Sequence, residues 1–583
     1  MRNKPLLIVS VAAVIALPAL AQQVAAPQPA PAAGAPATAN PSPTPSAEAA
    51  ISPTEGGADE TAVEEVSNSS LEPPALPVEY PGWARRDPWT VGPLDPANAR
   101  LSSDAWGEAS GPFLATLMRR MQTPLASRWL HIALRDALLA KVRAPANLHP
   151  VDWVAERAWL LLRLGEADAA RMLVAGVDAD RFTPKMVQVA VQSALANSDP
   201  PALCPLEEGI KEYDPGIQHL VQAMCASLAG EPESASAMID QARRFGRIGG
   251  VDLTLAEKVV GAGANGRTTS VEWDPVDSLT AWRFGLATGT GMLPPDRLIN
   301  AASPQLRAFQ ARAPLLTAQQ RLPSAMIAAG LGVFSSQTLV DLYSAIYDST
   351  DPGDLPASDA WQLRQAFVGK DADTRLAAIR KLLVTGKDGL QKEAARALVA
   401  RAATMVTPDA KLAADAPELI SAMLAGGYDD AAARWIPVVG RMDDANADRC
   451  WAMLALGAPN IADVGTGRIN SFIRRDKSTD RVRSALLVAG LAGLGRISTD
   501  TANSLNRRFG LSLGHITSWT KMIDAAAARG QGGTVVVLAG TGFQTSRFDR
   551  VPSAHLYHAV SALQRTGQDF TARMIAAEAL SRT

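Results

Sequence analysis

From Trp83 onward, apolar positions recur along the chain at helical spacing. Between residues 152 and 164, large apolar side chains fall three and four positions apart and share one face, with charged residues on the other face. Gly165 interrupts this period, which resumes at Ala169. The pattern predicts a helix, a tight glycine turn and an antiparallel helix. Each helix is marginal alone in water, so we expect the pair to bury their apolar stripes together.

The same arrangement recurs around Gly230, Gly427 and Gly567, each followed five residues later by alanine and then by a large apolar residue. The clearest copies are WLLLRLGEADAARMLVAGVD (159–178), LISAMLAGGYDDAAARWIPV (419–438) and VSALQRTGQDFTARMIAAEAL (560–580). In these segments the chain resembles tetratricopeptide-like helical-repeat proteins. The resemblance implies stacked hairpins and a scaffold or binding role. The copies do not recur at one period, so we expect an all-α, irregular α-solenoid of antiparallel helical hairpins.

One segment favours a strand by composition. Thr534–Leu538 reads TVVVL, and Gly540 and Gly542 follow it. A Gly-x-Gly after an apolar run is part of a dinucleotide-binding turn, but the third glycine and the βαβ surroundings are missing. We therefore predict a buried helix that ends in a glycine turn.

The N-terminus has the pattern of a secretory signal peptide. Arg2 and Lys4 precede an apolar stretch from Leu6 to Leu17, and Ala19-Leu20-Ala21 provides a small-x-small cleavage site. The stretch is shorter than the ~20 residues that span a bilayer. We predict a signal peptide over residues 1–21, cleaved after Ala21, and a periplasmic protein without membrane insertion after cleavage. The alternative is an uncleaved anchor.

Residues 22–82 contain 12 prolines, much alanine and few large apolar side chains. Such a composition buries too little apolar surface to offset chain entropy, so we expect a disordered, acidic Pro/Ala-rich segment. In the body, GAGANGRTTS (261–270) and YDSTDPGDLP (347–356) are rich in residues that break helices. They predict three regions, over residues 83–265, 266–352 and 353–583.

The charge balance excludes some partners. The whole chain has a formal net charge of −2, and residues 22–84 contain eight acids and no Lys, Arg or His. The body is therefore only weakly basic, which favours neither nucleic acid nor a membrane surface as partner.

The three cysteines are Cys204, Cys225 and Cys450. In an oxidising compartment Cys204 and Cys225 are the candidates for a disulfide, and the alternative is free thiols. Cys450 is expected to be a buried small apolar residue.

No motif for catalysis, a cofactor or a metal stands out. His555 and His558 have a spacing that can hold a metal, but they lack a third ligand. We therefore assign no catalytic, cofactor-binding or metal-binding residue. The basic segment FIRRDKSTDRVR (472–483) is the candidate site for an anionic polymer or a partner. The alternative is a solvated helix face. The basic residues of the segment are Arg474, Arg475, Lys477, Arg481 and Arg483.

These observations predict a non-catalytic periplasmic scaffold or adaptor that binds envelope proteins, with peptidoglycan as a further partner to consider. One alternative is a structural envelope component. Another is an enzyme of cell-wall metabolism, since the body resembles the helical superhelix of soluble lytic transglycosylases. Those enzymes also carry a compact mixed α/β catalytic domain with a Glu-Ser dipeptide, whereas the C-terminal third of this chain reads as helical throughout.

Overall fold

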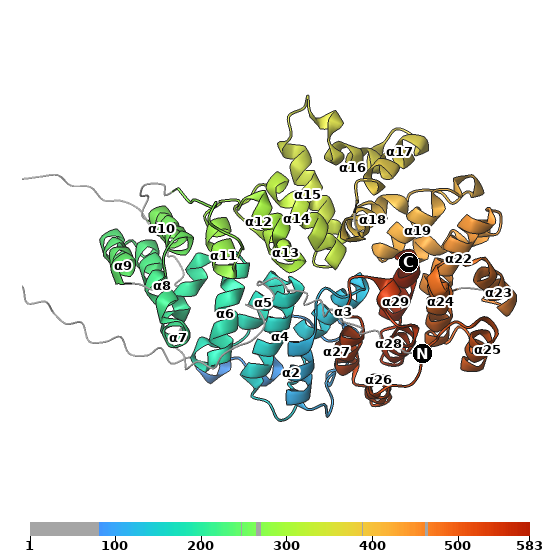
Figure 1. The fold of residues 1–583 in the computed structure, drawn as a ribbon, viewed down its shortest axis with the longest axis horizontal. Helices are drawn as coiled ribbons and strands as arrows, with labels where there is room; N and C mark the ends of the chain where they lie inside the picture. Colours follow the sequence, from blue (N-terminus) through green and yellow to red (C-terminus); the bar gives the residue numbers. More distant parts are fainter. Residues whose placement is uncertain (1–80, 246–247, 264–269, 388, 461–463) are drawn as a thin grey trace, which may run out of the picture.

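The structure, a computed structural model, describes residues 81–245, 248–263, 270–387, 389–460 and 464–583. All regular structure in these residues is helical, with 28 α-helices and eight short 3-10 helices and no named strand (Figure 1). The prediction of an all-α fold is confirmed. The predicted signal peptide (1–21), nearly all of the acidic segment 22–82 and most of the loop at 261–270 lie outside the described residues.

The chain first forms a central block of helices and then an arm at one end of the molecule (Figure 1). The central block consists of α2 (Gly111–Arg120), α3 (Arg128–Leu139), α4 (Pro150–Leu164), α5 (Ala167–Val174) and α6 (Pro184–Ala196). The arm consists of α7 (Glu207–Tyr213), α8 (Pro215–Leu228), α9 (Pro232–Phe245), α10 (Val251–Gly263) and α11 (Ala281–Gly289).

The chain then returns along the top of Figure 1 and builds a large lobe at the opposite end. The returning helices are α12 (Asp296–Ala301), α13 (Pro304–Arg312), α14 (Ala318–Leu331), α15 (Ser336–Ser349), α16 (Asp359–Val368), α17 (Ala372–Leu383) and α18 (Gly389–Ala403). The lobe adds α19 (Ala416–Ala425), α20 (Asp429–Ala433), α21 (Ile436–Val439), α22 (Asp444–Gly457), α23 (Thr466–Arg475), α24 (Val482–Gly493), α25 (Thr499–Phe509), α26 (Ser518–Ala528), α27 (Gly532–Gly542), α28 (Ser553–Arg565) and α29 (Asp569–Ser581).

Four glycine turns join helices where the sequence pattern places them. Gly165, Gly230, Gly427 and Gly567 have φ angles of 90°, 87°, 80° and 84°. Side chains with a Cβ rarely adopt this left-handed conformation, so glycine allows each helix to stop and the next to fold back. The helices on either side of each turn pack against each other. The predicted helical hairpins are therefore present.

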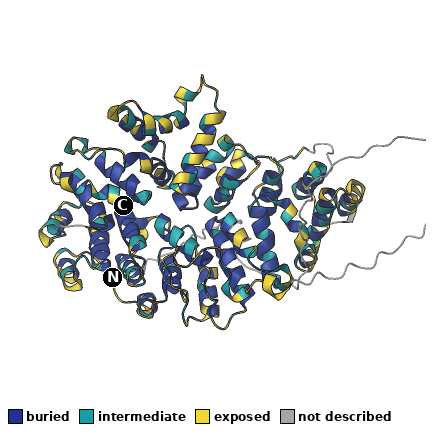
Figure 2. Cartoon of the chain, turned by 180° about the vertical axis from the view of Figure 1, so that it is seen from behind, coloured by how far each residue is buried: buried dark blue, intermediate teal, exposed yellow. Residues whose placement is uncertain are grey.

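The last helices of the chain pack against the first ones. α27 contacts α2 and α3, and α29 contacts α3 as well as its neighbours in the lobe (Figure 1). The main hydrophobic core accordingly includes residues from Val91 to Leu580, and a second core fills the arm. Buried residues lie along the helix faces that meet, and exposed residues lie along the outer edge of the molecule (Figure 2). The main core continues from Ile346 to Ala360, on either side of the boundary predicted near 352.

The segment with strand-like composition is a helix. α27 includes Thr534–Leu538, and all of these residues are buried. A Cβ at Gly533 would lie 2.9 Å from the ring of Trp106, so glycine allows the two elements to approach closely. Burial on all sides accounts for the run of β-branched residues, because a helix surrounded by protein has no polar face.

Candidate functional site

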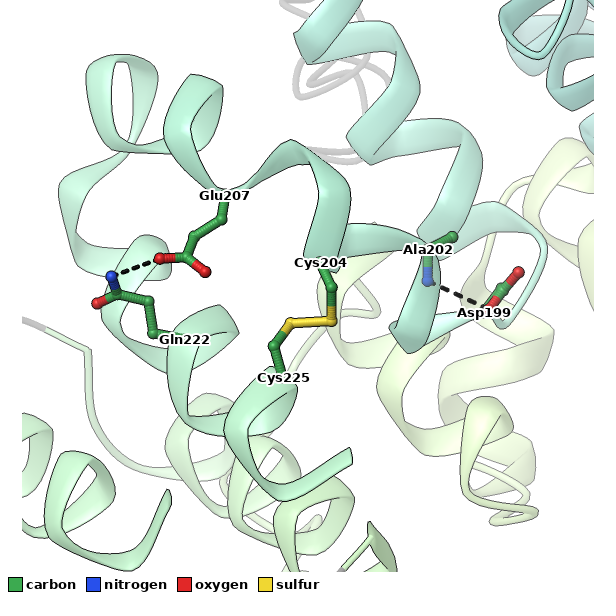
Figure 3. Close-up of a disulfide and its surroundings, with 6 residues drawn as sticks. All are labelled: Asp199, Ala202, Cys204, Glu207, Gln222 and Cys225. Carbon is green, nitrogen blue, oxygen red and sulfur yellow. Dashed lines mark hydrogen bonds between the residues drawn. A yellow bond between two sulfur atoms is a disulfide. The ribbon is translucent and has the colours of Figure 1, made fainter. Parts of the chain in front are cut away.

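The arm contains the Cys204–Cys225 disulfide, with a Cα–Cα distance of 5.6 Å (Figure 3). It ties the 3-10 helix η4 (Pro200–Leu206) to α8. The neighbouring Gln222 amide donates a hydrogen bond of 2.5 Å to the carboxylate of Glu207. Cys450 is a free, buried cysteine, and burial raises the pKa of its thiol to about 12. The thiol is therefore protonated at neutral pH and is not a ready nucleophile.

The structure separates the five predicted basic residues into two groups. Arg475 forms a two-bond ion pair with Asp448, with distances of 2.7 and 2.8 Å. Arg481 donates to the carbonyl oxygen of Phe509, and Arg474 is exposed at the end of α23. Lys477 and Arg483 line a large cavity in the lobe.

This basic cavity has a volume of about 980 Å³ and is bounded by α18, α19, α22, residues 477–483, residues 546–550 and the end of α29. α19 contacts α18, α22 and α29, so these walls come from helices that lie side by side (Figure 1). Eight basic and three acidic side chains line the basic cavity: Lys392, Arg396, Arg449, Lys477, Arg483, Arg547, Arg550 and Arg582, with Glu393, Asp480 and Asp549. The excess of basic groups gives the cavity a positive potential.

The floor of the basic cavity is an internally paired ionic network. Arg396 is buried and donates to Glu393 at 2.6 Å and twice to Glu418 at 2.9 and 3.0 Å. Arg449 and Lys392 also approach Glu418, at 3.1 and 3.8 Å. Burial alone would raise the pKa of Glu418, but the charge and hydrogen bonds of Arg396 outweigh it, and the pKa is lowered. These groups are committed to one another.

The rim of the basic cavity differs from the floor. Lys477 and Arg550 are exposed and have no ion pair with any described residue. Arg483 is partly buried, its buried Nε has no hydrogen-bond partner, and burial lowers the pKa of its guanidinium more than the nearby charge of Asp476 raises it. Lys477 and Arg550 are solvated and form no ion pair, so they can bind an incoming anion without giving up a partner in the protein. The rim is therefore the part of the basic cavity that is available to a ligand.

Asp476 fixes residues 476–484, which include Lys477 and, at the start of α24, Arg483; we call this segment the clamped loop. Its carboxylate accepts hydrogen bonds from the backbone N–H and the hydroxyl of Ser478, at 2.9 and 2.7 Å, and from those of Ser484, at 2.9 and 2.6 Å. Between these serines, Asp480 and Arg481 both have positive φ angles, 52° and 51°. Such non-glycine conformations cost about 1–3 kcal/mol each and persist only when the surroundings fix them. Asp476 supplies that constraint.

Beyond the floor, a second buried network joins the lobe to the central block. Glu578 on α29 accepts from the Ser127 hydroxyl at 2.5 Å, from the Arg128 backbone N–H at 2.8 Å and from Arg582 at 2.8 Å. The guanidinium of Arg128 donates to three backbone carbonyl groups, those of Ala329, Phe334 and Ala425. We call Ser127, Arg128, Glu578 and Arg582 the closing network, because it connects the first helices to the last. Sequence reasoning did not single out these residues.

His555 and His558 each lie close to a partner in the fold. His555 Nδ1 lies 3.0 Å from the carbonyl oxygen of Gly542, and His558 lies 2.9 Å from Asp524. Within the described residues, no group of three metal-ligating side chains occurs. The Glu-Ser pair of the chain, Glu233-Ser234, lies exposed in the first turn of α9.

No protein-family model matches this chain, and neither a curated protein nor a solved structure shows significant similarity to it. None of the described helices is long and apolar enough to cross a membrane.

Proposed function

We propose that this chain is a non-catalytic, exported scaffold or adaptor of the bacterial cell envelope that binds partner proteins at the basic cavity. The observation that carries the proposal is the pair of exposed rim cations that form no ion pair, Lys477 and Arg550, of which Lys477 lies on the loop that Asp476 holds in place. A preorganised site loses little entropy when it binds, and charge complementarity favours association with the correct partner.

The acids of the basic cavity support binding rather than glycoside hydrolysis. Glycosidases need a carboxylic acid that is poised to protonate the leaving group. Glu393 is bonded to Arg396, Asp549 is bonded to Arg547, and Asp480 is exposed. No acid that lines the described cavity is both enclosed and free of a cation.

In-cell photo-crosslinking tests the proposal directly. A photoreactive amino acid replaces Thr479, which is exposed, uncharged and lines the basic cavity, and a control protein carries it at Glu233, which is exposed on the arm. We expect a small, reproducible set of envelope proteins to be captured from position 479 and not from position 233. Capture of nothing specific, or of the same proteins from both positions, would overturn the proposal.

Export has a separate test. The intact mass of the protein isolated from the periplasm is expected to correspond to a chain that starts at Gln22. A chain that still starts at Met1 would contradict cleavage, and recovery from the cytoplasm alone would contradict the envelope role.

A further inference from the structure

The basic cavity also restricts the chemistry of its ligand. We infer that its occupant is an extended acidic peptide segment of a partner protein, with apolar residues interspersed among its carboxylates. This inference rests on the proposed function and adds the chemical class of the partner.

The size of the basic cavity is the first argument. Its volume of about 980 Å³ lies at the upper end of the ~300–1,000 Å³ range of small-molecule pockets. One inorganic anion would fill a small part of that space and would meet few of the basic residues. A stretch of several amino acids matches the volume.

The distribution of the cations is the second argument. Lys477 and Arg483 come from the clamped loop and Arg550 from the segment after α27, whereas Lys392 and Arg449, on α18 and α22, already approach Glu418. The cations that are left for a ligand therefore come from two separate segments of the chain. A ligand that satisfies them must carry several negative groups along its length.

The remaining lining is the third argument. Val482 is partly exposed and contributes apolar surface together with the aliphatic stems of the basic side chains, and Asp480 and Asp549 contribute negative charge. A uniform polyanion would be repelled by these acids and would leave the apolar surface unused. An acidic peptide brings apolar side chains for this surface and backbone N–H groups that can donate to the acids.

An anionic glycan fits the lining less well. Rings of sugars stack on exposed aromatic side chains, and the one aromatic residue that lines the described cavity, Phe548, is only 1% exposed. The Arg582 guanidinium also lies over that ring, 5.6 Å from its centroid. The structure therefore favours a peptide over a glycan.

A binding measurement with the full exported chain tests the inference. The probe is a fluorescent peptide of about eight residues that alternates glutamate with leucine or valine, and its twin carries glutamine in place of every glutamate. We expect the glutamate peptide to bind and the glutamine twin to bind at least tenfold more weakly. Added salt is expected to weaken the glutamate peptide more, because salt screens exposed charges.

A double variant locates the binding. Lys477→Gln with Arg550→Gln removes two exposed cations without touching the buried floor, and each lost contact is expected to weaken binding severalfold, so about tenfold together. The control, Arg474→Gln with Arg244→Gln, removes the same charge from exposed sites outside the basic cavity. Its affinity for the peptide is expected to match that of the unmodified protein.

The outcomes separate the two proposals. The acidic-peptide inference would be overturned if both peptides bound equally well. It would also be overturned if soluble peptidoglycan fragments or inorganic phosphate displaced the probe at concentrations at which unlabelled peptide does not. If crosslinking from position 479 still captured partner proteins in that case, the proposed function would stand. If crosslinking captured none, the proposed function would fail on its own evidence.

Discussion

The floor and the rim of the basic cavity contain the same types of basic side chain, but these are paired on the floor and unpaired on the rim. On the floor, Arg396 is buried and each of its donors meets a carboxylate or a carbonyl group. On the rim, Lys477 and Arg550 are exposed and form no ion pair with a described residue, and the buried Nε of Arg483 has no hydrogen-bond partner. Arginine that is paired inside the protein fixes the structure, whereas unpaired arginine at an opening is available for recognition. The partners of a basic residue thus indicate its role better than its charge does.

Breaking the closing network is expected to have the largest effect on stability. Glu578→Ala leaves Arg582, Ser127 and the Arg128 N–H without their shared acceptor. Loss of one member of a buried ion pair costs about 3–5 kcal/mol. The midpoint of urea unfolding, followed by circular dichroism, is expected to fall sharply. Glu231→Ala, at an exposed glutamate in the α8–α9 turn, serves as the control, and an equal fall in both variants would contradict the comparison.

Removing the disulfide is expected to loosen the arm and to leave the basic cavity intact. Replacing Cys204 and Cys225 with serine releases a cross-link between positions 21 residues apart, worth about 3 kcal/mol in the chain-entropy model. Hydrogen exchange is expected to accelerate in α7–α10, which belong to the separate core of the arm. Faster exchange in α18–α29 of this variant would show that the arm and the lobe unfold together.

The clamped loop gives a smaller, pH-dependent effect. Burial raises the pKa of Asp476, and hydrogen bonds from Ser484 and Ser478 lower it. The hydrogen bonds have the larger effect, so the pKa is lowered. An acid with a lowered folded-state pKa stabilises the protein above its unfolded value, near 4, and this stabilisation is lost as pH falls through the folded value. Asp476→Ala is expected to cost about 1–2 kcal/mol at neutral pH.

Thermal unfolding between pH 2 and 7 measures this contribution. The difference between the unmodified protein and Asp476→Ala is expected to shrink toward the acid end. Asp274→Asn, at an exposed aspartate, is the control. A difference that stays constant across this range would mean that the Asp476 carboxylate does not act through its charge.

Arg483→Met is expected to change stability least. The substitution removes a desolvated cation with an orphaned Nε and keeps an apolar stem, so the stability change is expected to stay within about 1 kcal/mol. Binding of the acidic peptide is nevertheless expected to weaken. Arg396→Met on the floor is the contrasting variant, because it strands Glu393 and Glu418. Similar stability losses in the two variants would remove the distinction between floor and rim.

The sequence predicted the local features of the fold better than the contact between its first and last helices. The hairpins can be identified from the sequence because their turns need a positive φ, which strongly favours glycine. The glycines concerned are Gly165, Gly230, Gly427 and Gly567. The contact of α29 with α3 involves side chains 451 positions apart, such as Ser127 and Glu578, and no periodic pattern records such a pairing.

The candidate site was predictable only in part. Residues 472–483 were selected for their charge, and Lys477 and Arg483 do line the basic cavity. The same composition could not reveal that Arg475 is neutralised by Asp448, nor that Arg550 joins the rim from a distant segment. The partners of a charged group are set by tertiary packing, which the local sequence does not specify.

The contact between α3 and α29 imposes an order on the folding of a newly made chain. A ribosome makes α3 long before α29, so the face of α3 that α29 covers stays without its partner until the last helix has been synthesised. Hairpins such as α4–α5 can close as soon as they emerge, because their partners are neighbours in sequence. A chain that is interrupted before residue 569 would contain most of its helices and still expose an apolar strip, which molecular chaperones and proteases recognise in unfinished proteins.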